Sequence, residues 1–388
     1  MNERGRMKIL IAAGAFKQSL TAAQACAAIA RGLQASGLDA DIEQLPSADG
    51  GNGTLDAFLA TGGERLRLPV LDPLLRSVDA EYGLIDVGKT AIIEMALASG
   101  LELLSPSELD PLRASTYGTG QLMADALARG VERIIIGLGG SATVDGGMGC
   151  LQALGLKLLD GTGQPIPSGG GGLADIATID DTNLDKRWDD VDIIIASDVE
   201  NPTLGEKGAA RIFGPQKGAD AAMVELLERN LEHCFTTVFE QRGVDVRQVK
   251  GGGAAGAFAA GLMAFLHCEI LSGIDLVLAH NRFGERLGGA SLVITGEGQI
   301  DAQTLDGKGP LGVAKLAGAD GVPTIALVGG LNIDDARLHQ AGVQAAFSIV
   351  DKPMPLEAAL ADADDLLRRA AMRLGYVLQL QFQNSRER

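Results

Sequence analysis

The chain has 388 residues, which is enough for two domains of ordinary size. Lys and Arg number 33 against 50 Asp and Glu, and the net charge of −17 is spread along the chain, which disfavours nucleic acid as a partner. The four cysteines lack disulfide or zinc-ligand spacing, and no apolar run is long enough to span a membrane. We therefore expect a cytoplasmic protein without a targeting segment.

The first 45 residues predict a βαβ unit, with a buried strand at 8–13, an alanine-rich helix at 22–35 and a second strand near 41–45. The first crossover loop, GAFKQSL at 14–20, follows the carboxyl end of a parallel strand, where open α/β sheets bind ligands. Residues 68–82 and 84–96 then alternate as short strands, which is typical of an antiparallel or mixed sheet. A helix at 120–129 leads into a strand at 133–137.

Three more apolar strands, at 291–298, 324–330 and 345–350, are spaced by helical stretches and resemble the opening βαβ unit. We therefore predict an α/β protein made of two domains. A discontinuous domain with a parallel sheet comprises residues 1–66 and 290–388, and a second α/β domain with a mixed sheet is inserted at 67–289.

Three sequence patterns imitate nucleotide-binding motifs. Residues 83–90, GLIDVGKT, satisfy the P-loop pattern, but strand-like residues lie on both sides of the glycine and lysine, so we expect a hairpin instead. Two runs resemble the dinucleotide fingerprint, although neither opens the first βαβ unit: Gly137, Gly139 and Ala142, then Gly251, Gly253 and Gly256. The second run equally fits close helix packing. An NAD(P)-dependent hydroxy-acid oxidoreductase remains an alternative function.

Residues 134–153, IIIGLGGSATVDGGMGCLQALG, form the most informative stretch of the chain. Glycines that follow an apolar strand allow backbone N–H groups to approach an anion closely. Gly139, Gly140, Ser141 and Thr143 are candidates for such contacts. Asp145 would repel an anion unless a cation lay between them, so the stretch indicates a phosphate or metal–phosphate site.

Seven loops combine glycines with isolated carboxylates, hydroxyls or a lysine. They are GAFKQSL, SADGGNGT, STYGTG, GGSATVDGG, SDVENP, GPQKGA and GEGQIDAQTLDGKGP. Because loops positioned by a rigid scaffold are where binding groups accumulate, we interpret the set as parts of a ligand site.

In this order and at this spacing, the seven loops resemble those of the bacterial glycerate kinase family, and the similarity extends over nearly the whole chain. The resemblance implies a flavodoxin-like domain that carries a large inserted α/β domain. It also implies transfer of the γ-phosphoryl group of ATP to D-glycerate with Mg²⁺, and it favours 2-phosphoglycerate as the product. The number of subunits is left open.

Some positions depart from the wording that is common in that family. Gly14 and Ala15 stand where Asp-Ser is frequent, Asn52 replaces a frequent acidic residue, and Val144 replaces a common Asn. A non-catalytic relative that binds a sugar acid is therefore a second alternative.

Phosphoryl transfer requires in-line placement, neutralisation of phosphate charge and a group that accepts the proton of the attacking hydroxyl. We predict Lys17 as a cation for phosphate or the glycerate carboxylate. Asp198, which ends the apolar stretch 191–198, is the preferred base or metal ligand, and Asp49 is second. The candidate Mg²⁺ ligands are Asp198, Asp49, Asp145 and Asp301.

The other candidates for binding substrate or phosphate are polar or glycine residues of the same loops. They are Ser19, Gly50, Gly51, Thr54, Gly139, Gly140, Ser141, Thr143, Asn201, Lys217, Glu297 and Lys308. A turn or helix-cap role is the alternative for Asp145 and Asp301, and a solvated loop charge is the alternative for Lys217.

Overall fold

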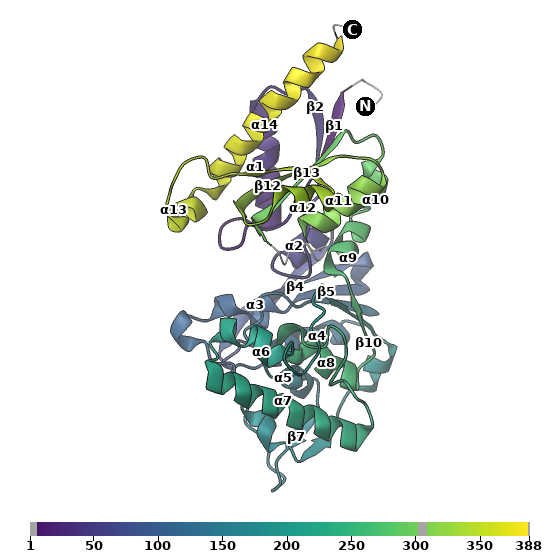
Figure 1. The fold of residues 1–388 in the computed structure, drawn as a ribbon. Coiled ribbons are helices and arrows are strands. Elements are labelled where there is room, and N and C mark those ends of the chain that lie inside the picture. Colours follow the sequence, from purple (N-terminus) through teal and green to yellow (C-terminus); the bar gives the residue numbers. More distant parts are fainter. Residues whose placement is uncertain (1–5, 302–308, 387–388) are drawn as a thin grey trace. The chain divides into compact units, whose positions relative to one another are not determined.

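A computed structural model describes residues 6–301 and 309–386, with side chains as far as residue 380. The chain forms two compact units. Unit 1 comprises Met1–Asp49, Asp56–Thr61 and Ile274–Arg388, and unit 2 comprises Gly50–Leu55 and Gly62–Gly273. Each unit contains its own sheet (Figure 1).

Unit 1 is built on a five-stranded parallel sheet in the order β13-β12-β11-β1-β2. The strands are β1 (Met7–Ala13), β2 (Ala40–Gln44), β11 (Leu292–Ile300), β12 (Thr324–Leu331) and β13 (Val343–Ser348). Counted along this unit, the arrangement is the 2-1-3-4-5 order of flavodoxin-like folds. The predicted flavodoxin-like, parallel-sheet architecture is therefore confirmed.

Helices cover both faces of this sheet, which explains why β1 is a continuous apolar run. Ile9 and Ile11 belong to a core shared with α1 (Ala22–Ala35) and α14 (Ala363–Arg386), two helices that lie side by side (Figure 1). Leu10 and Ala12 face the opposite core, formed with α9 (Gly273–His280), α10 (Phe283–Leu287) and α11 (Pro310–Ala319). This alternation is the period of two expected for a strand. The unit also contains α12 (Asp335–Gln340), α13 (Leu356–Ala361) and the part of α2 (Thr54–Leu59) that begins at Asp56.

The first helix, α1, begins at a capping box formed by Thr21 and Gln24. The Thr21 hydroxyl accepts a hydrogen bond from the Gln24 N–H at 3.2 Å, and the Gln24 side chain accepts one from the Thr21 N–H at 2.9 Å. This reciprocal capping box satisfies two N–H groups that lack partners within the helix. The observed helix has the same bounds as the predicted one.

Unit 2 contains a six-stranded mixed sheet in the order β10-β9-β6-β5-β4-β3. β3, β4 and β5 pair antiparallel, whereas β5, β6, β9 and β10 pair in parallel. These strands are β3 (Glu64–Leu71), β4 (Ser77–Ile85), β5 (Thr90–Glu94), β6 (Arg133–Gly137), β9 (Asp192–Ala196) and β10 (Cys268–Leu271). A second α/β domain with a mixed sheet was predicted, and it is confirmed.

The helices of unit 2 pack around this sheet to form one large apolar core. They are α3 (Ala96–Ser99), α4 (Tyr117–Ala128), α5 (Met148–Ala153), α6 (Ala209–Phe213), α7 (Ala221–Arg242) and α8 (Ala254–Phe265). A separate two-stranded sheet pairs β7 (Lys157–Leu159) with β8 (Thr178–Asp180). In the described part of the chain, no helix combines the length and apolar composition that crossing a bilayer requires.

The extent of the two units differs from the predicted domain boundaries. Residues 274–289 were predicted in the inserted domain, but they belong to unit 1, where Ile274, Leu278 and Phe283 pack against Leu10. At the other boundary β3 begins at Glu64, so residues 62–66 belong to unit 2. The apolar face of a short helix does not indicate which domain core it packs against, so the sequence pattern alone could not assign residues 274–289 to unit 1.

The P-loop pattern at 83–90 is a hairpin, as predicted. β4 and β5 pair antiparallel through Ile85 and Thr90, and the turn between them carries Val87 fully exposed at φ +58°. Lys89 forms an ion pair with Glu132 at 2.7 Å, and the Lys89 side chain is 62% exposed. The backbone here does not open a helix, so it cannot provide the phosphate cradle of a P-loop.

Candidate functional site

A cavity of about 500 Å³ lies in unit 1 beside the loops that follow β1 and β11. The strand order reverses between these two neighbouring strands, and ligands of open α/β sheets bind at such a point. Four of the predicted site residues line the cavity, namely Lys17, Ser19, Glu297 and Asp301. The structure thus brings together one cation, one hydroxyl and two carboxylates that are far apart in the sequence.

The loop after β1 holds Lys17 in a closed turn. Phe16 and Leu20 exchange two backbone hydrogen bonds of 2.9 Å, and the Ser19 hydroxyl donates to the Phe16 carbonyl at 2.9 Å. Gln18 lies at φ +64° within the turn, and Lys17 is exposed. The turn therefore presents the ammonium group of Lys17 without burying it.

Another part of the cavity lining is apolar and comes from the C-terminal part of the chain. It includes Ile349, which follows β13, Leu356 and Leu360 of α13, and Leu366 of α14. The cavity therefore has a polar side near β1 and β11 and an apolar side near α13.

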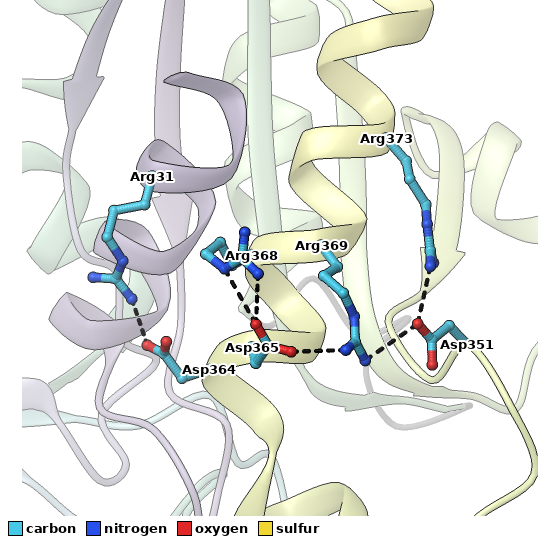
Figure 2. Close-up of polar contacts among 7 residues, drawn as sticks. All are labelled: Arg31, Asp351, Asp364, Asp365, Arg368, Arg369 and Arg373. Carbon is cyan, nitrogen blue, oxygen red and sulfur yellow. Dashed lines mark hydrogen bonds and ion pairs between the residues drawn. The ribbon is translucent and has the colours of Figure 1, made fainter. Parts of the chain in front are cut away.

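Ion pairs fix the segment after β13 to α14, as Figure 2 shows. The Asp351 carboxylate pairs with Arg373 at 2.9 Å and with Arg369 at 3.2 Å, and Arg369 also contacts Asp365 at 2.7 Å. The hydrogen bond from Arg373, followed by the charge of Arg369, lowers the pKa of Asp351. Since Ile349 and Val350 line the cavity just before Asp351, this network holds part of the apolar wall.

In unit 2, the carboxyl ends of three parallel strands lie in register. Glu94 of β5 pairs with Gly137 of β6, which pairs with Ala196 of β9. The segment Gly50–Leu55 lies over this edge, because the Gly139 N–H donates to the Gly50 carbonyl at 2.9 Å. Predicted site residues from two of the glycine loops, SADGGNGT and GGSATVDGG, therefore lie at this edge of the sheet.

Gly50 occupies a position that only glycine fits. Its φ is +89°, and a Cβ atom there would lie 2.2 Å from the Ala196 carbonyl oxygen. Nearby, the Thr54 hydroxyl donates to the Gly51 carbonyl at 2.6 Å, and a Cβ on Gly139 would lie 2.3 Å from the Gly51 Cα. Gly50, Gly51 and Thr54 thus form one turn, which packs tightly against Gly139.

Glu94 is a buried carboxylate at this edge that the sequence analysis did not single out. Its carboxylate accepts hydrogen bonds from the Gly53 N–H at 3.1 Å and from the Leu55 N–H at 3.2 Å, and the residue is 4% exposed. A carboxylate beside the first N–H groups of α2 stabilises that helix start. The available signal was an acidic residue at the end of an otherwise apolar strand, TAIIE.

Asp145 is turned into the core of unit 2. Its carboxylate accepts four hydrogen bonds, from the Thr116 N–H and hydroxyl at 2.8 Å, the Gly147 N–H at 3.1 Å and the Gly149 N–H at 3.3 Å. Burial raises the pKa of Asp145, and these hydrogen bonds oppose that rise. The geometry is that of a carboxylate that organises its own loop, which was the alternative interpretation for this residue.

Lys217 is also buried, with 1% exposure, on the other side of the same loop. Its ammonium group donates to the Ser141 hydroxyl at 2.9 Å and to the Thr143 carbonyl at 2.7 Å. Burial lowers the pKa of Lys217 to about 7, and the charge of Asp145 partly offsets that decrease. The alternative of a solvated loop charge is therefore wrong for Lys217.

The remaining candidates take various positions. Asp198 and Asn201 follow β9, both half-buried, and the Asn201 side-chain amide donates to the Lys207 carbonyl at 2.8 Å. Asp49 is half-buried at the end of the first segment of unit 1. Lys308 lies outside the described residues. Within residues 6–301 and 309–380, no three His, Cys, Asp or Glu side chains are grouped to hold a metal ion.

The fingerprint-like runs do not have the geometry of a dinucleotide site. After Gly137, Gly139 and Ala142, the next helix begins only at Met148. The second run packs against the glycine loop, since the Gly146 N–H donates to the Gly256 carbonyl at 3.0 Å. Close packing through small residues therefore accounts for the second run.

Comparison with known proteins finds similarity over nearly the whole chain. The model of the glycerate kinase family matches residues 9–379. Glycerate kinase of Halalkalibacterium halodurans is 47% identical over 370 residues, covering 95% of this chain and 97% of that protein. Glycerate 2-kinase of Escherichia coli K12 is 44% identical over 380 residues, covering 98% and 100%.

A similar crystal structure exists for a Salmonella typhimurium LT2 protein assigned as glycerate kinase 2. It is 43% identical in sequence, has a TM-score of 0.84, and the match covers 98% of this chain and 100% of that one. The shared fold, the glycine loops and the full-length similarity lead to one conclusion: the chain belongs to the glycerate kinase family.

Proposed function

We propose that the protein is an ATP-dependent glycerate kinase that transfers the γ-phosphoryl group to the 2-hydroxyl of D-glycerate. The main support is membership of the family over residues 9–379, together with full-length relatives named glycerate kinase. The 2-position is supported by the Escherichia coli relative, which is named glycerate 2-kinase. The four free cysteines support action in a reducing cytoplasm.

The cavity of unit 1 offers the groups that polyphosphate binding requires. Lys17 supplies a positive charge, and Ser19 supplies a hydroxyl on the same turn. A lysine at this position favours phosphate electrostatically.

The residues present also fit Mg²⁺. Glu297 and Asp301 line the same cavity, and carboxylate oxygens are ligands that magnesium prefers. One or two carboxylates suffice, because Mg²⁺ usually keeps waters and substrate phosphates in its shell. When bound, the ion would neutralise negative charge on the phosphates. Asp49 and Asp198 remain further candidates for this role.

In unit 2, we assign Asp198 as the acceptor of the proton from the glycerate hydroxyl, with Asn201 close behind it in the loop after β9. Gly140, beside the turn of Gly50, Gly51 and Thr54, offers its backbone N–H to anionic oxygens, whereas the N–H groups of Gly139 and Thr54 already donate to the Gly50 and Gly51 carbonyls. Asp145 and Lys217 are positioning residues, because both are buried and both bind the loop that carries Gly139 and Gly140.

The direct test is incubation with ATP, Mg²⁺ and D-glycerate, followed by measurement of ADP release and by phosphorus NMR of the product. We expect ADP release that depends on D-glycerate and a product phosphorylated at C2. Lys17→Ala and Asp198→Asn should each lower kcat by about 100-fold or more without unfolding the protein. No ADP release would contradict the proposal, whereas NADH oxidation with a keto acid would favour the oxidoreductase.

A further inference from the structure

We infer that the apolar wall of the unit 1 cavity binds the base and ribose of the nucleotide, with the phosphates directed toward Lys17. The inference rests on the proposed function, because it assigns one part of a proposed substrate to one part of the cavity.

The first support is the division of the cavity into two chemically distinct sides. Lys17 follows β1, Glu297 lies near the carboxyl end of β11 and Asp301 directly follows it, whereas Leu356 and Leu360 come from α13. A nucleoside triphosphate is divided in the same way, into a charged polyphosphate and a flat, weakly polar base. Glycerate has no such division, because each of its three carbons carries oxygen.

The second support is the exposure and size of the site. Leu356 is 73% exposed, and it lies beside a cavity of about 500 Å³. Contiguous apolar surface in a cavity is typical of ligand-binding grooves, and Leu356 lines this one together with Leu360 and Leu366. The volume falls within the range of about 300–1,000 Å³ found for sites of drug-sized ligands, and it exceeds what a three-carbon acid fills.

The third support is that the wall is held in place before any ligand arrives. Asp351, just beyond Ile349 and Val350, is fixed to α14 by Arg369 and Arg373 (Figure 2). A preorganised wall binds a rigid aromatic ring with a smaller loss of conformational entropy. The ion pairs therefore hold the segment that carries Ile349 and Val350, and none of the paired side chains lines the cavity.

Two substitutions test the inference. Leu356→Ser removes an apolar surface from an exposed side chain, and Ala359→Trp fills the cavity from the same helix. Leu380→Ser is the matched control, since Leu380 is 64% exposed on α14 and does not line the cavity. Calorimetry would measure the Kd for ATP and for inorganic tripolyphosphate, which carries the phosphates but no base, and steady-state kinetics would measure KM for ATP and D-glycerate.

We expect Leu356→Ser to raise the Kd for ATP about fivefold and Ala359→Trp to raise it more than about tenfold. Tripolyphosphate affinity, KM for D-glycerate and all constants of Leu380→Ser should change by less than about twofold. An unchanged Kd for ATP in both cavity variants would overturn the inference, and so would an equal loss of tripolyphosphate affinity.

These results separate the inference from the proposed function. If the wild-type protein phosphorylates glycerate but the Kd for ATP is unchanged in both cavity variants, the inference fails and the proposed function stands. If ATP binds with the expected sensitivity to Leu356 and Ala359 but glycerate is not phosphorylated, the function fails and the nucleoside site stands.

Discussion

The ammonium group of Lys217 lies 2.7 Å from the carbonyl oxygen of Thr143 and donates a hydrogen bond to it. The same loop contains Asp145, whose carboxylate is 1% exposed and accepts hydrogen bonds from Thr116, Gly147 and Gly149. Two buried groups of opposite charge thus hold the loop from both sides. Removing either of them leaves the other charge in a poorly solvated environment, which is costly.

The burial of Lys217 predicts a pH-dependent stability. Burial lowers its pKa from 10.5 to about 7, so between these pH values the unfolded chain holds a proton that the folded chain has released. The contribution of Lys217 to the free energy of unfolding therefore increases with pH across this window. Below about pH 7 the buried side chain is charged, so the full cost of burying that charge is present. We therefore expect the free energy of unfolding of the wild type to increase relative to that of Lys217→Met from pH 7 to about pH 9.5.

Urea unfolding of both proteins at several pH values would measure this difference. The control is Lys207→Met, which alters an exposed lysine and should show no such trend. A difference that stays constant with pH would show that Lys217 keeps its ordinary pKa in the folded protein.

Replacing Asp145 with Asn should destabilise unit 2. The amide would direct an NH₂ group toward N–H and O–H donors, so at least one of the four hydrogen bonds would be lost in a buried site. We expect a loss of about 2–3 kcal/mol in the free energy of unfolding, measured by urea denaturation. Asp160→Asn is the control, because Asp160 accepts similar hydrogen bonds from Thr162 and Gln164 in an exposed turn. Equal effects of the two substitutions would contradict the importance of burial.

Gly50→Ala should disrupt the edge of the unit 2 sheet. Gly50 and Gly130 have similar backbone angles, at φ +89° and +82°, but only at Gly50 would a Cβ meet another backbone atom within 4 Å. Gly130→Ala should therefore cost only the left-handed strain of about 1 kcal/mol, whereas Gly50→Ala should cost at least about 2 kcal/mol more and lower kcat. Thermal unfolding and the kinase assay would measure both effects, and similar melting temperatures for the two variants would refute the close approach.

Lys89→Ala should leave catalysis intact despite the P-loop pattern around it. Lys89 is on an exposed hairpin and pairs only weakly with Glu132 across the surface, as exposed ion pairs do. We expect kcat/KM for ATP to change by less than about twofold, in contrast to the large loss expected for Lys17→Ala. A large loss for Lys89→Ala with unchanged folding would restore the P-loop interpretation.

The sequence was sufficient to predict the two sheets. The continuous apolar run of β1 follows directly from burial on two faces, and the alternation over Ser77–Tyr82 of β4 follows from burial on one. The hairpin at 83–90 was predictable for the same reason, because strand-like residues surround the lysine.

Polar contacts between distant segments were not predictable from local pattern. Lys217 and Thr143 are 74 positions apart, and Glu94 lies 41 positions from Gly53, so no spacing rule connects them. Glycine and aspartate mark a loop as special, but their side-chain direction depends on tertiary packing. That is why the glycine loop could be singled out from the sequence, whereas the burial of Asp145 and Lys217 emerged only from the structure.

The pairing of β1 with β11 also has a consequence for synthesis. β1 ends at Ala13, whereas its neighbour β11 begins at Leu292, so the ribosome must translate all of unit 2 between them. At roughly 5–20 residues per second, this delay is on the order of tens of seconds. During that time one edge of an apolar strand waits without its partner, a state that chaperones recognise and that favours aggregation. The inserted unit is therefore expected to mature first, and the nascent N-terminus is the segment most in need of protection.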